Sequence, residues 1–171
     1  MKRIAVCLLC LAAIVARAEE APPAAVSLAD FLKTQGYSEI ELSENTAKQS
    51  EVEVVLNGKH SLVMLVDTGA SMTLFDYDRL DDLGFELEKT DIEFHGVGGK
   101  QRLYSAQAAN MELGGAETGP ISLLVGDLSD FKKTLTAFGS RPVDGLIGHD
   151  FLSRYSAVIE VKHSKLYLRI R

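Results

Sequence analysis

An unbroken apolar run that ends in an aspartate constrains this chain more than any other feature. Residues 62–66 are all apolar, and Asp67 follows them directly. Such a run is typical of a strand buried on both faces, so its sheet must be covered on both sides. A carboxylate left unpaired at the end of a buried strand is costly. Asp67 must therefore find partners, shift its pKa or serve a reaction.

The residues after Asp67 decide little by themselves. Thr68 and Ser71 provide hydroxyl groups, and Gly69 lets the backbone approach a neighbour closely. The tripeptide Asp-Thr-Gly alone favours an ordinary turn at the end of a strand, since Asp and Gly are common turn residues. A catalytic role for Asp67 therefore depends on what the rest of the chain contains.

Alternation of apolar and polar residues predicts a mostly β domain. Val52, Val54 and Leu56 alternate with their neighbours, and Asn57-Gly58 follows as a strong signal for a type I′ hairpin turn. Further strands are expected around residues 40–42, 92–94, 102–109, 111–113, 121–125, 157–161 and 165–170. Short helices are expected at residues 27–36, 76–83 and 148–154, the first two capped by Ser27 and Asp76. Many short strands separated by turn signals indicate a barrel-like domain.

The N-terminus has the pattern of a signal peptide. A basic start precedes an apolar run at residues 4–15, and Ala16-Arg17-Ala18 is typical of a cleavage site. The run is too short to span a bilayer, which takes ~20 residues. We expect an exported protein, periplasmic or secreted, without a stable membrane anchor; an uncleaved anchor is the alternative. The expected divisions are a signal peptide at 1–18, a linker at 19–26, a helix and lead-in strand at 27–49, and one domain at 50–171.

Charge and cysteine content exclude several classes of function. The net charge is -6, and loss of the leader with its three basic residues would make it -9, so nucleic acid is not an expected partner. Both cysteines lie in the leader, which leaves no disulfide or cysteine metal site afterwards. The histidines lack zinc-site spacing, Gln101 stands where a phosphate loop needs Ser or Thr, and no Gly-x-Ser-x-Gly occurs. No metal or cofactor is expected.

Three motifs, taken in order, resemble the retropepsin-like aspartic proteases. They are the strand ending in Asp67-Thr68-Gly69-Ala70-Ser71, the glycine-rich tip Gly96-Val97-Gly98-Gly99 inside residues 94–104, and the apolar-apolar-Gly motif Leu146-Ile147-Gly148. The resemblance covers roughly residues 51–169. It implies a retropepsin-like acid-protease barrel, mostly β with short helices, and one lobe per chain.

The resemblance also implies an activity. Only one Asp-Thr-Gly occurs, and Asp144-Gly145 lacks the intervening Thr, so a homodimer would supply Asp67 twice. Such a dimer would be an aspartic endopeptidase acting on peptides or proteins. Thr68 would fix the two loops across the axis, Gly69 would allow backbone contact with substrate, and the glycine-rich tip would close as a flap. The alternative is a catalytically silent dimer that binds peptides or serves assembly.

Two positions depart from the viral pattern. Viral members often carry an Asp and an Arg that pair, where this chain has Ser71 and His149. His149 has two interpretations: ordinary hydrogen bonding at the start of a helix, or a pH-sensitive group near the site.

Overall fold

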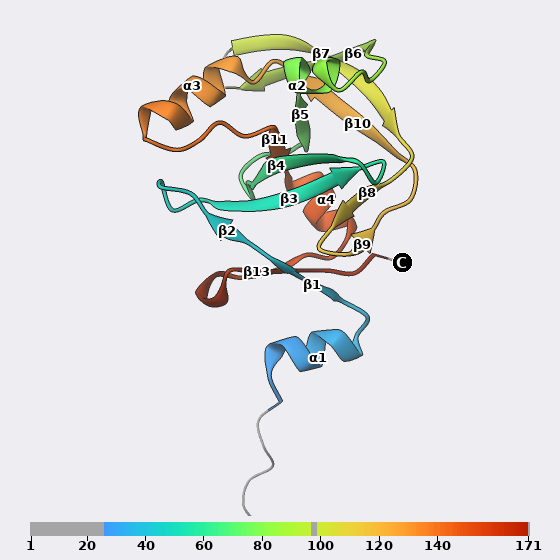
Figure 1. Cartoon of the computed structure of the whole chain (residues 1–171), viewed down its shortest axis with the longest axis vertical. Coiled ribbons are helices and arrows are strands. Elements are labelled where there is room, and N and C mark those ends of the chain that lie inside the picture. Colours follow the sequence, from blue (N-terminus) through green and yellow to red (C-terminus); the bar gives the residue numbers. More distant parts are fainter. Residues whose placement is uncertain (1–25, 97–98, 171) are drawn as a thin grey trace, which may run out of the picture.

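The computed structural model describes residues 26–96 and 99–170. The expected signal peptide, all but the last residue of the expected linker, and Val97 and Gly98 of the expected flap tip lie outside these residues. Figure 1 shows a body of strands with short helices around it, and a helix, α1 (Leu28–Thr34), at the end opposite to α2, α3 and the flap strands.

The hairpin that leads to Asp67 forms as expected. Strands β3 (Ser50–Leu56) and β4 (His60–Val66) pair antiparallel. Asn57 and Gly58 join them with φ angles of 54° and 65°, so the predicted positive-φ turn is confirmed. One face of β4 packs in the main core through its buried Leu62 and Met64. The other face packs through Leu65 in a second cluster, so this strand is covered on both sides.

A crossover places the apolar-apolar-Gly motif beside the Asp67 strand. Strand β11 (Gly145–Ile147) lies parallel to β4 and antiparallel to β5 (Leu74–Asp76). Within the described residues the larger sheet runs in the order β6-β7-β10-β5-β11-β4-β3-β8-β9, with β2 paired to β3. The remaining bounds are β2 (Ser43–Glu44), β6 (Glu88–Gly96), β7 (Gly99–Ala108), β8 (Met111–Leu113), β9 (Ala116–Glu117) and β10 (Ile121–Gly126). This sheet is open at β6 and β9 instead of closing into a barrel, and the mostly β prediction is confirmed.

A smaller sheet joins the two ends of the described chain. Strand β13 (Lys165–Leu168) lies between β1 (Ser38–Glu41) and β12 (Val158–Glu160). A 3-10 turn (Val161–His163) and Ser164, in the left-handed region at φ 52°, connect β12 to β13. Ile40 and Leu166 pack in the same core as Val54. The lead-in segment is therefore packed onto the larger sheet.

Two of the three expected helices begin at the caps read from the sequence. Ser27 caps α1 by accepting from Asp30 N, and Asp76 caps α2 (Tyr77–Asp82) by accepting from Arg79 N. Helix α4 (His149–Arg154) follows Gly148 directly, as expected. Helix α3 (Ser129–Ala137) was not expected. It buries only Leu135 and exposes most of its other side chains, so few of its residues are apolar core residues that would mark a helix in the sequence.

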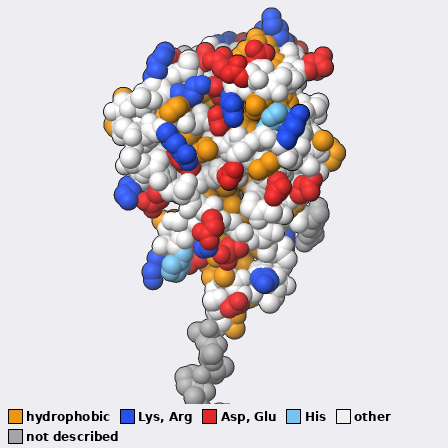
Figure 2. Space-filling model, viewed as in Figure 1, with side chains coloured by type: hydrophobic (Ala, Val, Ile, Leu, Met, Phe, Trp, Pro, Cys, Tyr) orange, Lys and Arg blue, Asp and Glu red, His pale blue; other side chains and the backbone are white. Residues whose placement is uncertain are grey.

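The surface carries charges of both signs. On the face shown in Figure 2, acidic and basic side chains are interspersed over most of the body, without a basic patch of the kind that binds nucleic acid. Among the described helices, none has the length and apolar character needed to cross a membrane.

Candidate active site

Backbone pairing fixes the position of Asp67. β11 extends along β4 so that Leu146 lies opposite Leu65 and Ile147 opposite Val66. Asp67 N continues this ladder by donating to Ile147 O at 3.0 Å. The parallel strand therefore holds the Asp67 backbone at the edge of the core, and its side chain is half-buried.

The loop after β4 forms a turn and also binds the Asp67 carboxylate through a backbone N–H. Gly69 N donates to Asp67 Oδ1 at 2.8 Å, and Ala70 N donates to Asp67 O at 3.2 Å. An amide N–H that donates to a carboxylate oxygen fixes the orientation of that group. Thr68, Gly69 and Ser71 are exposed, so this loop is at the surface of the isolated chain.

Gly148 allows two backbone segments to touch. A Cβ at this position would lie 2.4 Å from Met72 C, although the φ of −96° suits any residue. Its N–H donates to Thr73 Oγ1 at 2.9 Å, and Thr73 N and Oγ1 donate to Asp150 Oδ1 at 2.8 and 2.7 Å. The sequence analysis did not single out Thr73 and Asp150. An Asp in the first turn of α4 was the only signal for them.

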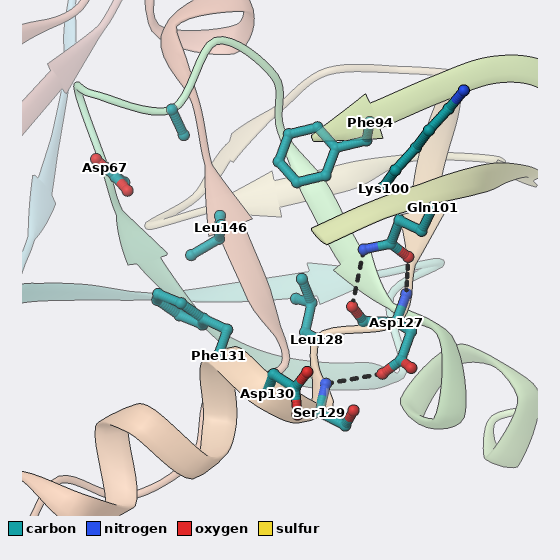
Figure 3. A pocket seen from close by; sticks show the side chains of 11 residues that line it. Asp67, Phe94, Lys100, Gln101, Asp127, Leu128, Ser129, Asp130, Phe131 and Leu146 are labelled. Carbon is teal, nitrogen blue, oxygen red and sulfur yellow. Dashed lines mark hydrogen bonds between the residues drawn. The ribbon is translucent and has the colours of Figure 1, made fainter. Parts of the chain in front are cut away.

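The Asp67 carboxylate faces a pocket of about 320 Å³ (Figure 3). Three parts of the chain form its walls: the Asp67 loop with β11, the flap strands β6 and β7, and the segment that begins α3. The lining residues are Asp67, Ala70, Phe94, Lys100, Gln101, Asp127, Leu128, Ser129, Asp130, Phe131 and Leu146.

A polar clasp closes one side of this pocket. Gln101 Nε2 donates to Asp127 O at 3.0 Å, and Asp127 N donates to Gln101 Oε1 at 2.8 Å. The Asp127 carboxylate accepts from Ser129 N at 2.8 Å. Hydrogen bonds from the Ser129 backbone and side chain lower the pKa of Asp127, and the charges of Lys132 and Lys133 add to this effect. Asp127 therefore stays ionised at neutral pH, beside the pocket.

The flap hairpin is present on both sides of its tip. β6 and β7 pair up to Gly96 opposite Gly99, and Lys100 Nζ lies 2.8 Å from Glu93 Oε2. Phe94 and Gln101 of this hairpin line the pocket.

The expected residues of the Asp67 loop and of the apolar-apolar-Gly motif take three kinds of position. Asp67, Ala70 and Leu146 line the pocket. Thr68 lines a separate shallow hollow together with His149 on the other side of the loop. Gly69, Ile147 and Gly148 act through the backbone contacts described above.

Comparison with solved structures shows a related fold. A retropepsin-like aspartic protease from Rickettsia conorii aligns over 77% of this chain and 89% of its own, with 21% identity and a TM-score of 0.50. EIAV protease, in complex with the inhibitor HBY-793, aligns over 69% of this chain and 98% of its own, with 22% identity and a TM-score of 0.49.

The sequence itself matches a protein family. The family model described as aspartyl protease covers residues 52–151, from β3 to α4, which is more than half of the chain. The chain belongs to the retropepsin-like aspartic protease family. No curated protein matches it at the sequence level.

In this family member, the third wall of the pocket came from a segment that the sequence analysis missed. Leu128, Phe131 and Leu135 have the 3–4 spacing of one helix face, which was the available signal for α3. Leu135 is buried, and Phe131 packs against the same second cluster as Leu65 and Leu146.

The start of α4 makes an ordinary backbone contact in this protease-family chain. His149 N donates to Ala70 O at 2.8 Å, which ties α4 to the Asp67 loop. The His149 side chain is exposed, and its role as a pH-sensitive group stays a prediction. Within residues 26–96 and 99–170, no group of three or more His, Cys, Asp or Glu is placed to hold a metal ion.

Proposed function

We propose that this chain is an aspartic endopeptidase whose active form is a homodimer, with one Asp67 from each copy. The observation that carries the proposal is the half-buried Asp67 carboxylate, oriented by Gly69 N and open to a pocket between the flap and α3. Membership of the aspartyl protease family supports the reaction class.

The surface around the loop supports a two-fold pair. The chain contains one Asp-Thr-Gly, so a dyad needs a second copy. The exposed Thr68 and Gly69 leave the loop open to a partner. A shallow hollow next to them is lined by Thr68, His149, Leu152, Ser153, Ser156, Ala157 and Ile159. A second copy that covered this face would bring the two Asp67 loops together.

The chemistry follows from two close carboxylates. Two such groups cannot both ionise cheaply, so the pair shares one proton, as in aspartic proteases generally, and titrates as a unit. The ionised carboxylate takes a proton from a water molecule while the protonated one donates to the peptide carbonyl oxygen. The water oxygen bonds to the carbonyl carbon. In the collapse of this neutral diol, the carboxyl group that took the water proton gives it to the amine nitrogen, and the C–N bond breaks. One hydroxyl group of the diol returns its proton to the other carboxylate as the carbonyl reforms, so the pair again holds one proton.

The proposed place of action is outside the cytoplasm, in the periplasm or as a secreted protein. The basic, apolar and small-residue pattern of residues 1–18 supports it. The mass of the purified protein tests this point, because cleavage after Ala18 would remove those residues.

The decisive experiment compares the full chain, expressed with its leader, with its Asp67→Asn and Asp82→Asn variants. Asp82 is an exposed carboxylate on α2 and serves as the matched control. Each protein is incubated with a diverse peptide library at several pH values, and products are identified by mass spectrometry. Solution mass gives the oligomeric state.

We expect a dimer that cleaves peptides, with turnover lowered at least about a hundredfold in Asp67→Asn and unchanged in Asp82→Asn. Equal turnover by wild type and Asp67→Asn would overturn the proposal. A dimer that binds peptides and cleaves none at any pH would instead favour the binding or assembly module.

A further inference from the structure

Helix α3 is fixed at its N-terminal end by a buried carboxylate. Asp76 is 2% exposed and accepts from Leu128 N at 3.3 Å and from Lys132 Nζ at 2.5 Å. Lys132 is the fourth residue of α3, so this single carboxylate holds the start of the helix and the end of its first turn. The end of β5, which carries Asp76, therefore sets where α3 begins.

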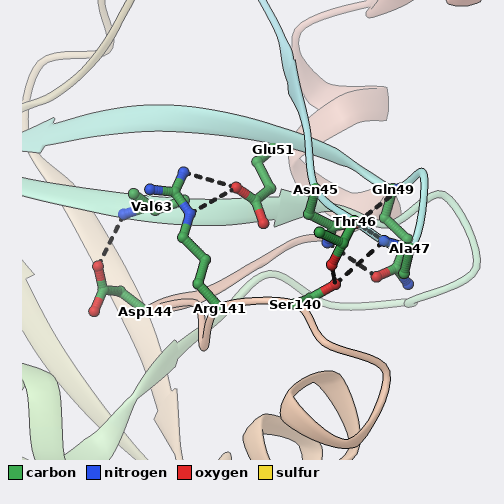
Figure 4. Close-up of polar contacts among 9 residues, drawn as sticks. All are labelled: Asn45, Thr46, Ala47, Gln49, Glu51, Val63, Ser140, Arg141 and Asp144. Atoms are coloured by element: carbon green, nitrogen blue, oxygen red, sulfur yellow. Dashed lines mark hydrogen bonds and ion pairs between the residues drawn. The ribbon is translucent and has the colours of Figure 1, made fainter.

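The segment after α3 is fixed at three further points (Figure 4). The Ser140 hydroxyl, which is buried, lies 2.9 Å from Thr46 Oγ1 and accepts from Ala47 N at 3.3 Å. Arg141 donates twice to the buried Glu51 Oε2, at 3.1 Å from Nε and 2.7 Å from Nη2. Val63 N donates to Asp144 Oδ2 at 2.9 Å. The helix is thus held at both ends to the sheet that carries Asp67.

Between these anchors, α3 presents one aromatic ring to the pocket. Leu135 packs in the second cluster with Leu65 and Leu146, and Phe131, one turn earlier, lies against this cluster. Figure 3 shows the Phe131 ring facing the cavity below Leu146, on the same side of the pocket as Asp67. The anchors fix the backbone of α3, and the contact with the second cluster places the Phe131 ring at the wall of the pocket.

Apart from Asp67, the charged side chains that line the pocket are each paired or hydrogen-bonded. Lys100 pairs with Glu93 at 2.8 Å, and Asp130 pairs with Lys133 at 2.8 Å. Asp127 accepts from Ser129 N. A charged substrate side chain would lose its hydration here and meet groups that are already engaged. An apolar side chain would instead bury its surface against the rings and aliphatic groups of Phe94, Leu128, Phe131 and Leu146.

We propose that Phe131 determines specificity: its ring bounds the subsite for the substrate side chain next to the scissile bond and limits the size of the apolar side chain that this subsite accepts. The inference rests on the proposed function, which places the scissile bond at Asp67. In this proposal, Phe131 of α3 contacts the substrate side chain and so influences where a peptide is cut.

The test uses the full chain with Phe131→Ala and Phe131→Leu, and with Phe138→Ala as the matched control. Phe138 ends the same helix, is 72% exposed and does not line the pocket. From a library peptide that the wild type cleaves, two series are made with Ala, Leu, Phe or Trp on either side of the cut. The ratio of kcat/KM values between Leu and Trp peptides is compared, and thermal unfolding checks that each variant is folded.

We expect Phe131→Ala to shift this ratio toward Trp by about tenfold or more in one series, since a change of even one methylene group in an apolar pocket changes discrimination to this extent. Phe131→Leu should shift it less, and Phe138→Ala should leave it at the wild-type value. Phe131→Leu decides the matter if Phe131→Ala does not fold. Ratios in the Phe131 variants equal to those of Phe138→Ala would overturn the inference and leave the protease proposal intact.

A second readout separates the two proposals. The affinity of the same peptides is measured by fluorescence anisotropy in an Asp67→Asn background, with and without Phe131→Leu. A binding preference for large apolar residues that depends on Phe131 would support the subsite even if the wild type cleaves no peptide. The absence of cleavage would then count against the protease proposal but not against the subsite. If the wild type cleaves nothing, library peptides that contain Leu or Trp serve as the probes. Equal affinities with and without Phe131→Leu would then overturn the subsite proposal as well.

Discussion

Gln101 and Asp127 join the flap to the start of α3 through two hydrogen bonds, one in each direction. The side chain of Gln101 satisfies both the N–H and the C=O of a residue that belongs to no strand. Gly126 makes this close approach possible, because a Cβ there would lie 3.0 Å from Leu103 Cδ2 and 3.2 Å from Gln101 Oε1. Two walls of the pocket are therefore connected to each other as well as to the core.

Replacing Gln101 should separate these two walls. Gln101→Ala removes two hydrogen bonds and should lower the free energy of unfolding by about 1–2 kcal/mol, since each contributes about 1 kcal/mol net. Gln107→Ala is the control: it lies on the same strand, is exposed and gives up one side-chain bond, to Ser122 Oγ at 3.2 Å. Urea unfolding measures the stability of both variants. Equal losses of unfolding free energy would mean that the two hydrogen bonds between Gln101 and Asp127 add no stability beyond that of a single surface bond.

The pair of Asp76 and Lys132 should behave asymmetrically. Asp76 is buried, while the Lys132 side chain is 25% exposed. Lys132→Met leaves a buried carboxylate without its cation and should cost roughly 2–4 kcal/mol of stability, more than Asp76→Asn, whose stranded ammonium group can reach water. Unfolding of both single variants and the double variant measures this order, and the double variant should lose less than the sum.

Lys133→Met is the control for this prediction, because Lys133 is the next residue of α3 and its pair with Asp130 is exposed. Its effect should stay within about 0.5 kcal/mol. Additive effects of Asp76→Asn and Lys132→Met would mean that the two side chains do not interact in solution.

Local signals explain why part of the fold was predictable. Asn57 and Gly58 adopt the positive φ that their residue types tolerate, and Asp76 caps the helix that it precedes. These features depend on neighbours along the chain. The pairing of β1 with β13 joins residues such as Ile40 and Leu166, which are far apart in sequence, and no local pattern specifies it.

The site shows the same division. Asp67 stood out because a carboxylate ends an apolar strand, and its loop geometry follows from Gly69. The α3 wall did not stand out, since its position depends on distant contacts from Asp76 and Glu51 more than on its own helix propensity. The position of Phe131 in the pocket depends on those distant contacts, because they place the helix that carries it.

Asp127 should contribute stability that depends on pH. Its pKa is lowered from the ordinary value of 3.8, so the folded state favours the ionised carboxylate. The contribution is present above the unfolded pKa and is lost as the pH falls through the lower folded pKa. Asp127→Ala, which removes the acceptor for Ser129 N at the start of α3, should cost about 1 kcal/mol at pH 7.

The difference between wild type and Asp127→Ala should shrink below about pH 4, where the carboxylate of the unfolded chain becomes protonated. Asp91→Ala, an exposed carboxylate on strand β6, is the control and should show no comparable loss at pH 7. Unfolding measured from pH 3 to 7 tests this, and a difference that grew toward low pH would contradict the sign.

Gly148 should be the least replaceable glycine among those that hold the Asp67 loop. A Cβ would lie 2.4 and 2.5 Å from Met72 C and O and 2.9 Å from Thr73 N, which are backbone atoms. They cannot retreat easily, because Gly148 N donates to Thr73 Oγ1 and His149 N donates to Ala70 O. Gly148→Ala should therefore lower the free energy of unfolding by about 3 kcal/mol, the upper end of overpacking costs. Ser71→Ala, at an exposed position of the same loop, should change it by less than about 0.5 kcal/mol. If urea unfolding gave both variants the wild-type midpoint, the contact between Gly148 and the Met72–Thr73 backbone would be looser in solution than in the structure.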